Sequence, residues 1–84
     1  MTPTERLVLT LRYGLDDDVS RSLREVGRVL GHSGEWARQV ESGAFRRLLI
    51  LAGAHLAGAV LSTSQREDLN TMYPAWVARQ LAHP

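Results

Sequence analysis

The chain contains no cysteine and no lysine, and only five of its 84 residues are aromatic. Without cysteine it can form neither a disulfide nor a thiolate metal site. The absence of lysine leaves arginine at all ten basic positions. Either a GC-rich genome or selection for guanidinium chemistry explains this bias. The net charge is only +1, which is a smaller surplus than dedicated nucleic-acid binders usually carry.

Long hydrophobic runs are also missing. The longest, Leu48 to Leu61, is interrupted by His55 and falls short of the roughly 20 residues that a membrane span requires. The chain does not begin with the basic and then apolar regions of a signal peptide. We therefore expect no membrane association and a cytoplasmic location.

No catalytic arrangement of side chains is recognisable. His32, His55 and His83 are far apart and have no carboxylate at metal-ligand spacing. The serines lack a neighbouring base, and no glycine-rich phosphate loop is present. We predict that the chain is not an enzyme and holds neither a metal ion nor a cofactor.

Signals for helix ends recur along the first half of the chain. Thr2 and Glu5 form a capping box at the start of a first helix. Gly14 is expected to end that helix, because the residue just past a helix often needs a positive φ. Ser22 and Ser33 are placed to cap two further helices.

The segment 22–48 predicts two amphipathic helices joined by a short turn at 31–34. The predicted buried positions are Leu23, Val26, Val29 and Leu30 in the first helix and Ala37, Val40, Ala44 and Leu48 in the second. Two short helices joined by a glycine-bearing turn are typical of a helix-turn-helix. In that motif the second helix enters the major groove of DNA.

The second half predicts further helices. Residues 48–61 are apolar nearly all round, which indicates a buried helix. Ser64 and Glu67 form a capping box for a short helix that reaches Met72. Tyr73-Pro74 is expected to interrupt it before a last helical stretch at 75–82.

We predict an all-α fold of five or six helices in a single small domain. Residues 1–49 would form the helix-turn-helix unit, and residues 50–84 a C-terminal helical extension packed on it. A core of this size is necessarily thin.

The outward face of the second helix of the motif carries side chains that suit base recognition. Arg38 can pair with guanine, Gln39 with adenine, and Glu35 can accept a hydrogen bond from cytosine. The candidate phosphate contacts are Arg24, Arg28, Ser33, Arg46 and Arg47. A solvated helix face with surface ion pairs has the same composition, so both interpretations stay open.

Three runs resemble region 4 of primary-type bacterial sigma factors. Residues 11–16 read Leu-Arg-Tyr-Gly-Leu-Asp, residues 22–27 Ser-Leu-Arg-Glu-Val-Gly, and residues 38–41 Arg-Gln-Val-Glu. The resemblance covers about residues 4–49. It implies a domain that reads the upstream promoter element and holds the β flap of RNA polymerase, with the positions of Glu35, Arg38 and Gln39 reading bases.

The chain departs from this family where cations are usual. Gly34, Trp36 and Gly43 take the places of basic residues, which predicts weaker phosphate binding with a flatter salt dependence. Trp36, Tyr73 and Trp76 are candidate protein-interface residues, because aromatic side chains are favoured anchors there. Packing of Trp36 against the C-terminal helices is the alternative.

The expected function is a sigma region-4-like regulator that lacks promoter-melting segments. It would bind RNA polymerase through the β flap, double-stranded DNA, or both. The alternative is a protein-interaction module that kept the fold and lost DNA binding, with a homodimer formed through the C-terminal helices. A response-regulator output domain, which also contains a helix-turn-helix, is a third possibility.

Overall fold

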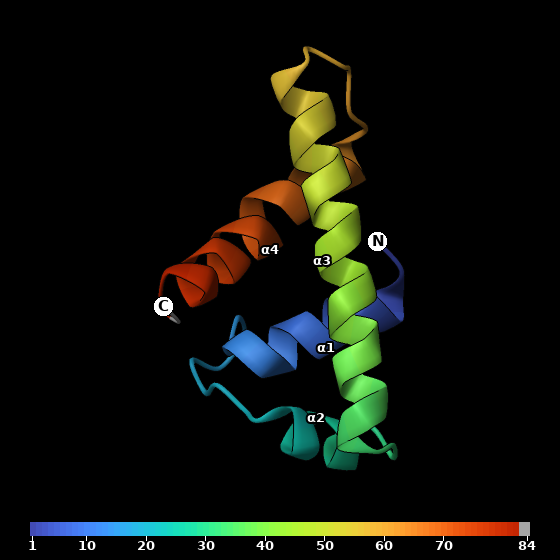
Figure 1. The fold of residues 1–84 in the computed structure, drawn as a ribbon, viewed down its shortest axis with the longest axis vertical. Helices are drawn as coiled ribbons and strands as arrows, with labels where there is room; N and C mark the ends of the chain where they lie inside the picture. The colour runs from blue at the N-terminus through green and yellow to red at the C-terminus, as the bar shows by residue number, and fades with distance from the viewer. Residues whose placement is uncertain (83–84) are drawn as a thin grey trace.

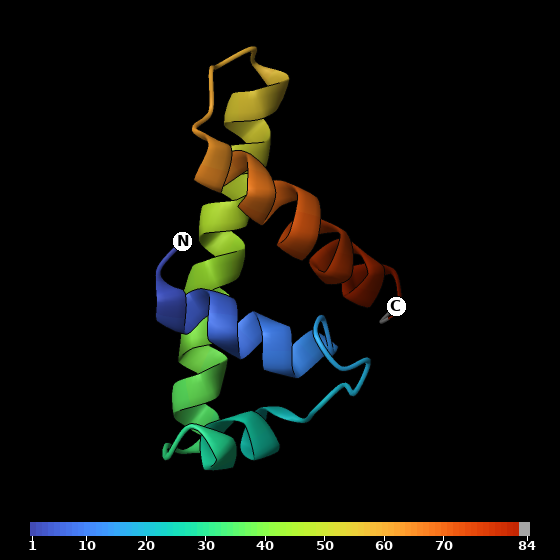
Figure 2. The ribbon, with the colours of Figure 1, turned by 180° about the vertical axis from the view of Figure 1, so that it is seen from behind.

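The computed structural model describes the backbone of residues 1–82 and the side chains of residues 1–77. The helices are α1 (Pro3–Tyr13), α2 (Leu23–Val29), α3 (Gly34–Leu56) and α4 (Thr63–Ala82). The long helix α3 forms the axis of the molecule, α1 and α2 lie across its first half, and α4 leans away from its second half (Figures 1 and 2). The described residues contain no strand, which confirms the all-α fold class.

The predicted helix caps are confirmed. The Thr2 hydroxyl accepts a hydrogen bond from the Glu5 backbone N–H at 3.1 Å, and the Glu5 carboxylate accepts one from Thr2 at 2.9 Å. Gly14 ends α1 with φ 65°. The hydroxyls of Ser22 and Ser33 accept from backbone N–H groups three residues ahead, at 3.1 and 3.0 Å. Local signals thus start each of the first three helices.

The prediction of a separate buried helix at 48–61 is wrong. The helix α3 continues from the helix-turn-helix without a break to Leu56, so the predicted boundary at residue 49 falls inside it. Ile50 is 66% exposed and Leu56 86% exposed, because this part of α3 extends beyond α1 (Figure 1). No helix among the described residues is both long and apolar enough to cross a membrane.

The start and the course of α4 also differ from the prediction. Ser62 and Gln65, and not Ser64 and Glu67, form the capping box: the two backbone N–H groups donate to each other's side chains at 2.9 and 3.2 Å. The helix then runs through Pro74. Proline removes one backbone hydrogen bond, and Pro74 is exposed. The described chain therefore has four helices instead of five or six.

Two buried clusters form the core on opposite sides of α1. The α2-side cluster consists of Val8, Val26 and Ala37. The α4-side cluster consists of Leu9, Ala44, Leu48 and Met72. Val29, which was predicted to be buried, is 54% exposed, because it lies at the edge of the stripe of Leu23, Val26 and Leu30 through which α2 packs.

Asp68 attaches α4 to the start of α1. It is 3% exposed, and its carboxylate accepts hydrogen bonds from the Arg6 Nε at 2.9 Å and from the Met1 ammonium at 3.1 Å. Burial raises the pKa of Asp68. The hydrogen bonds from Arg6 and the ammonium group, together with their positive charges, outweigh burial and hold the pKa below its ordinary value.

This ion pair predicts an acid-sensitive attachment of α4. Because the native pKa of Asp68 is lowered, its stabilisation is fully present above the ordinary value of 3.8 and is lost as the pH falls through the native pKa. We expect Asp68→Asn to lower the free energy of unfolding at about pH 6 and to flatten its decline toward about pH 2. Urea denaturation across this range measures both effects.

Glu67→Gln is the matched control, because Glu67 is the exposed neighbour of Asp68 in the chain. It should keep the acid response of the wild type. The prediction would be wrong if the free energy of unfolding of Asp68→Asn declined with falling pH as steeply as that of the wild type.

Candidate nucleic-acid interface

The backbones of α2 and of the start of α3 approach each other closely. A Cβ atom on Gly27 would lie 2.3 Å from the carbonyl oxygen of Ser33, and one on Gly34 would lie 3.1 Å from the Arg24 Cα. The His32 backbone N–H donates to the Gly27 carbonyl at 2.7 Å and closes the turn. This tight junction sets the direction in which α3 leaves the body of the domain.

The three predicted base-reading residues meet on one exposed face of α3. Arg38 Nε donates to the Glu35 carboxylate at 2.9 Å, and Gln39 Nε2 donates to it at 3.4 Å. All three are exposed, whereas Ala37 between them is fully buried. The first turns of α3 therefore hold Glu35, Arg38 and Gln39 together and away from the core.

Glu35 is the shared acceptor of this group. Its hydrogen bond with Arg38 lowers the pKa of Glu35 and raises the pKa of Arg38. Both side chains are consequently charged at neutral pH. Because the pair is exposed, water and salt screen it, and a base edge can compete for the Arg38 guanidinium at little cost.

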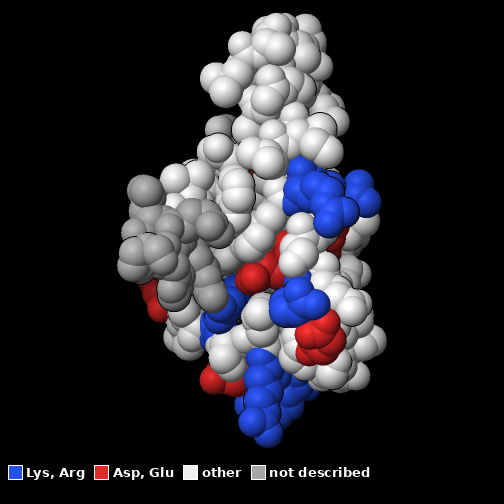
Figure 3. Space-filling view, in the orientation of Figure 1, with Lys and Arg blue, Asp and Glu red and all other residues white. Residues whose placement is uncertain are grey.

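The phosphate candidates have different surroundings. Arg24 and Arg28 on α2 and Arg46 on α3 are exposed. The Ser33 hydroxyl caps α3, and Arg47 donates to Glu5 at 3.1 Å, which ties α3 to α1. Figure 3 shows arginine atoms at the end formed by α2 and the start of α3, and none over the last turns of α3. Phosphate contact by these five residues stays a prediction.

The departures from the sigma pattern have different surroundings. Gly34 lies against Arg24 of α2, and the nearest atom to a Cβ on Gly43 would be a carboxylate oxygen of Glu5 on α1, at 3.7 Å. Trp36 is half-buried and packs on the α2-side cluster. Gly43 follows Gln39 by four residues and so lies on the same side of α3. Weaker phosphate binding through the missing cations stays a prediction.

The aromatic candidates pack within the chain. Trp36 stacks on His32 with ring centroids 3.8 Å apart, far from α4, so the predicted packing against the C-terminal helices does not occur. Trp76 lies 5.4 Å from both Phe45 and Tyr73, measured between ring centroids, beside the α4-side cluster. A contact of Trp36, Tyr73 or Trp76 with a partner stays a prediction.

One buried ion pair was missed. Arg12 on α1 donates to Glu41 on α3 at 3.2 Å, and it also donates to the Arg21 carbonyl at 2.6 Å. Both side chains of the pair are nearly buried. They belong to runs that resemble the sigma pattern, but 29 residues separate them. No local spacing rule could have paired them.

The histidines do not converge. His32 lies in the turn before α3, and His55 lies near the far end of the same helix. His83 lies outside the described residues.

Comparison with known proteins identifies the first half of the chain. The family described as "Sigma-70, region 4" matches residues 1–48. The RNA polymerase sigma factor SigA of Listeria monocytogenes is 52% identical over 48 residues, which is 57% of this chain and 13% of the relative. The probable RNA polymerase sigma-C factor of Synechocystis is 46% identical over 48 residues, 57% of this chain and 12% of the relative. No solved structure matches.

The matched segment contains α1, α2, the turn and the first part of α3, and it ends before α4. The chain spans about an eighth of the length of these relatives, which are 52% and 46% identical to it over the shared segment. The helix-turn-helix at 22–48 and the exposed face of α3 lie inside the match. Through residues 1–48, the chain belongs to the sigma-70 region 4 family, a family of helix-turn-helix domains that bind DNA and RNA polymerase.

Proposed function

We propose that the chain is a sigma region-4-like transcription regulator that reads promoter DNA with α3 and binds the β flap of RNA polymerase. The observation that carries the proposal is the exposed face of α3 on which Glu35, Arg38 and Gln39 meet, inside the segment that matches the family. With these two partners, the chain would act in the cytoplasm.

The residues divide into two roles. Arg38 and Gln39 would contact base edges, where bidentate pairs carry sequence information. Arg24 and Arg28 on α2 would contact phosphates, which position the domain without reading sequence. With two phosphate contacts, from Arg24 and Arg28, binding would weaken only moderately as salt rises.

Removal of Arg38 tests the reading of DNA. We expect Arg38→Ala to weaken binding to a promoter-like duplex by about 1–3 kcal/mol, roughly 5-fold to 150-fold, and to relax preference at one base pair. Fluorescence anisotropy at low salt measures the affinity. Arg28→Ala should weaken all duplexes equally and lower the salt slope by about one.

Arg66→Ala is the matched control, because it removes the same charge from α4, beyond the matched segment. It should leave duplex binding unchanged. A wild-type chain that binds no duplex even at low salt would refute the DNA-reading function. Co-elution with RNA polymerase from the source cell tests the second partner.

The uncharged end of α3 favours a second candidate function, a protein-interaction module. Ile50 and Leu56 of α3 and Val60 of the loop that follows are 66%, 86% and 94% exposed, and the face of this end that Figure 3 shows carries no charged atoms. Single apolar residues on a surface are ordinary, but a contiguous group indicates an interaction site. A homodimer formed here would double the mass in sedimentation equilibrium, and a monomer at all concentrations would refute it.

A further inference from the structure

The face of α1 and α3 that lies opposite α2 is closed by a residue from outside the region 4 segment. The α2-side cluster, Val8, Val26 and Ala37, is complete within residues 1–48. The α4-side cluster takes Leu9, Ala44 and Leu48 from that segment but needs Met72 of α4 to complete it. The region 4 segment alone would therefore leave an apolar face open on α1 and α3.

The helix α4 covers this face mainly with one stripe of side chains. Asp68, Met72 and Trp76 follow at intervals of four residues and so lie on one side of the helix. Asp68 pairs with Arg6 at the start of α1. Met72 enters the α4-side cluster, and Trp76 lies against Phe45. The stripe has the chemistry of an amphipathic helix that carries one carboxylate ahead of two bulky apolar groups.

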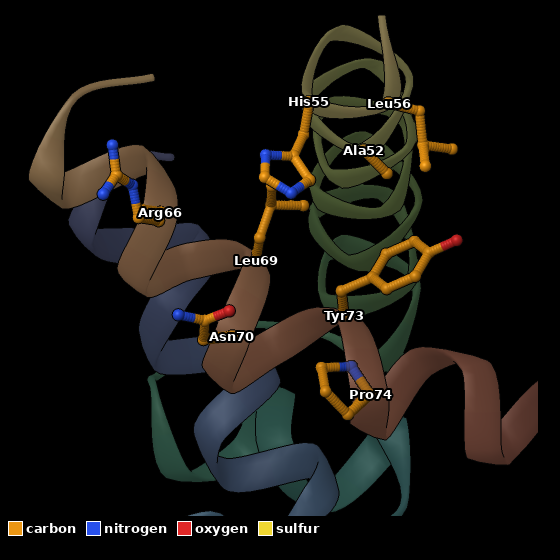
Figure 4. A pocket seen from close by; sticks show the side chains of 8 residues that line it. All are labelled: Ala52, His55, Leu56, Arg66, Leu69, Asn70, Tyr73 and Pro74. Carbon is orange, nitrogen blue, oxygen red and sulfur yellow. The ribbon is translucent and has the colours of Figure 1, made fainter. Parts of the chain in front are cut away.

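Beside this stripe, the Ser64 hydroxyl accepts a hydrogen bond from Arg6 at 2.7 Å, and Tyr73 packs on the α4-side cluster. A half-open pocket of about 350 Å³ lies between the first turns of α4 and the last turns of α3. Figure 4 shows His55 and Ala52 of α3 on one side of this pocket and Leu69 and Tyr73 of α4 on the other. The close packing that is typical of protein interiors thus does not extend along the whole interface of α4 with α3.

The position of α4 leaves the DNA-reading face open. The stripe lies against α1 and the middle of α3, whereas Glu35, Arg38 and Gln39 lie at the beginning of α3. Figures 1 and 2 show α4 away from the start of α3. Occupancy of the apolar face by α4 therefore does not block the predicted contact with DNA. The two surfaces can be regulated separately.

We propose that α4 is a displaceable helix that occupies, within the chain, the face of α1 and α3 that receives RNA polymerase. The identity of the partner rests on the proposed function. The partner presents an amphipathic helix with a carboxylate one turn before a bulky apolar residue, and this helix replaces the Asp68 and Met72 contacts. Binding of polymerase and attachment of α4 exclude each other.

While α4 is attached, the apparent affinity of the chain for polymerase is lower. A tethered helix competes at a high effective concentration, and the apparent dissociation constant of a partner rises in inverse proportion to the open fraction. A change that releases α4 and leaves α1 and α3 intact increases that fraction. The affinity for polymerase then rises although no contact with polymerase has been added.

The experiment compares Asp68→Ala with Glu67→Ala in the full chain, since both remove one negative charge from neighbouring positions of α4. We expect Asp68→Ala to bind core RNA polymerase at least about tenfold more tightly than the wild type, and Glu67→Ala to bind like the wild type. Circular dichroism checks that each variant is folded. Met72→Ser is the second releasing variant if Asp68→Ala does not fold.

Hydrogen exchange of the wild-type chain gives an independent readout. In the complex with polymerase, the amides of α4 should exchange faster, and those of α1 and the middle of α3 more slowly, than in the free chain. Protection of α4 in the complex, or unchanged affinity of Asp68→Ala, would overturn the proposal.

A synthetic peptide of residues 63–82 separates this proposal from the proposed function. If neither the wild type nor Asp68→Ala binds polymerase, the polymerase function is wrong and the labelled peptide decides whether α4 can be displaced. It should bind Asp68→Ala at least about tenfold more tightly than the wild type. Equal binding to both chains refutes a displaceable α4.

Discussion

Alanine in place of Gly27 is expected to lower the free energy of unfolding by about 3 kcal/mol, the upper part of the range for overpacked positions. The added Cβ would lie 2.3 Å from the Ser33 carbonyl oxygen and 2.5 Å from its carbon. These atoms belong to the backbone of the turn, so no rotamer change relieves the overlap. The end of α2 and the start of α3 would have to move apart. Urea denaturation measures the change.

Gly53→Ala is the control for this prediction. Gly53 lies within α3, and a Cβ there meets no atom within 4 Å. Alanine should therefore stabilise the chain by about 0.5–1 kcal/mol through helix propensity alone. If Gly27→Ala were as stable as the wild type, the close approach of α2 and α3 would be wrong, and with it the orientation of the reading face.

Arg12→Ala is expected to destabilise the chain by about 3–5 kcal/mol, which is typical when one partner of a buried ion pair is removed. The variant leaves the Glu41 carboxylate buried without its partner and also removes the donor to the Arg21 carbonyl. The pair holds α1 against α3 between the two core clusters. Urea denaturation at neutral pH measures the loss.

A double-mutant cycle separates the interaction energy of the Arg12–Glu41 pair from the cost of leaving one charge buried without its partner. Arg12→Met combined with Glu41→Met should be clearly more stable than either single variant, since no unpaired charge then remains buried. The exposed Glu35–Arg38 pair on the same helix supplies the comparison. Because water and salt screen that pair, its removal should cost far less than the removal of Arg12. If removal of either pair lowered the free energy of unfolding equally, the prediction that burial makes Arg12 important would be wrong.

Features encoded within a few residues were predictable. The caps at Thr2, Ser22 and Ser33 each depend on a side chain and a backbone group three residues apart, so the local sequence specifies them. The buried positions Val26, Ala37, Ala44 and Leu48 follow from helical periodicity. The outward direction of Arg38 follows from the same periodicity, because it neighbours the buried Ala37.

The errors lie where a distant segment decides the outcome. The apolar composition of 48–61 predicted burial, but Ile50 and Leu56 are exposed, because α4 covers only one side of that part of α3. Pro74 was expected to interrupt α4, but its exposed position lets the helix continue.

Local sequence patterns were enough to establish an all-helical fold, the helix-turn-helix at 22–48 and the region 4 family. The folded arrangement alone established that Trp36 packs on the α2-side cluster, that Arg12 pairs with Glu41, and that α4 closes the apolar face of α1 and α3. Caps and helical periods act over three or four residues, where the backbone prescribes the geometry. Contacts between helices depend on which segments come together in space, and in this small core a few such contacts decide what the surface presents.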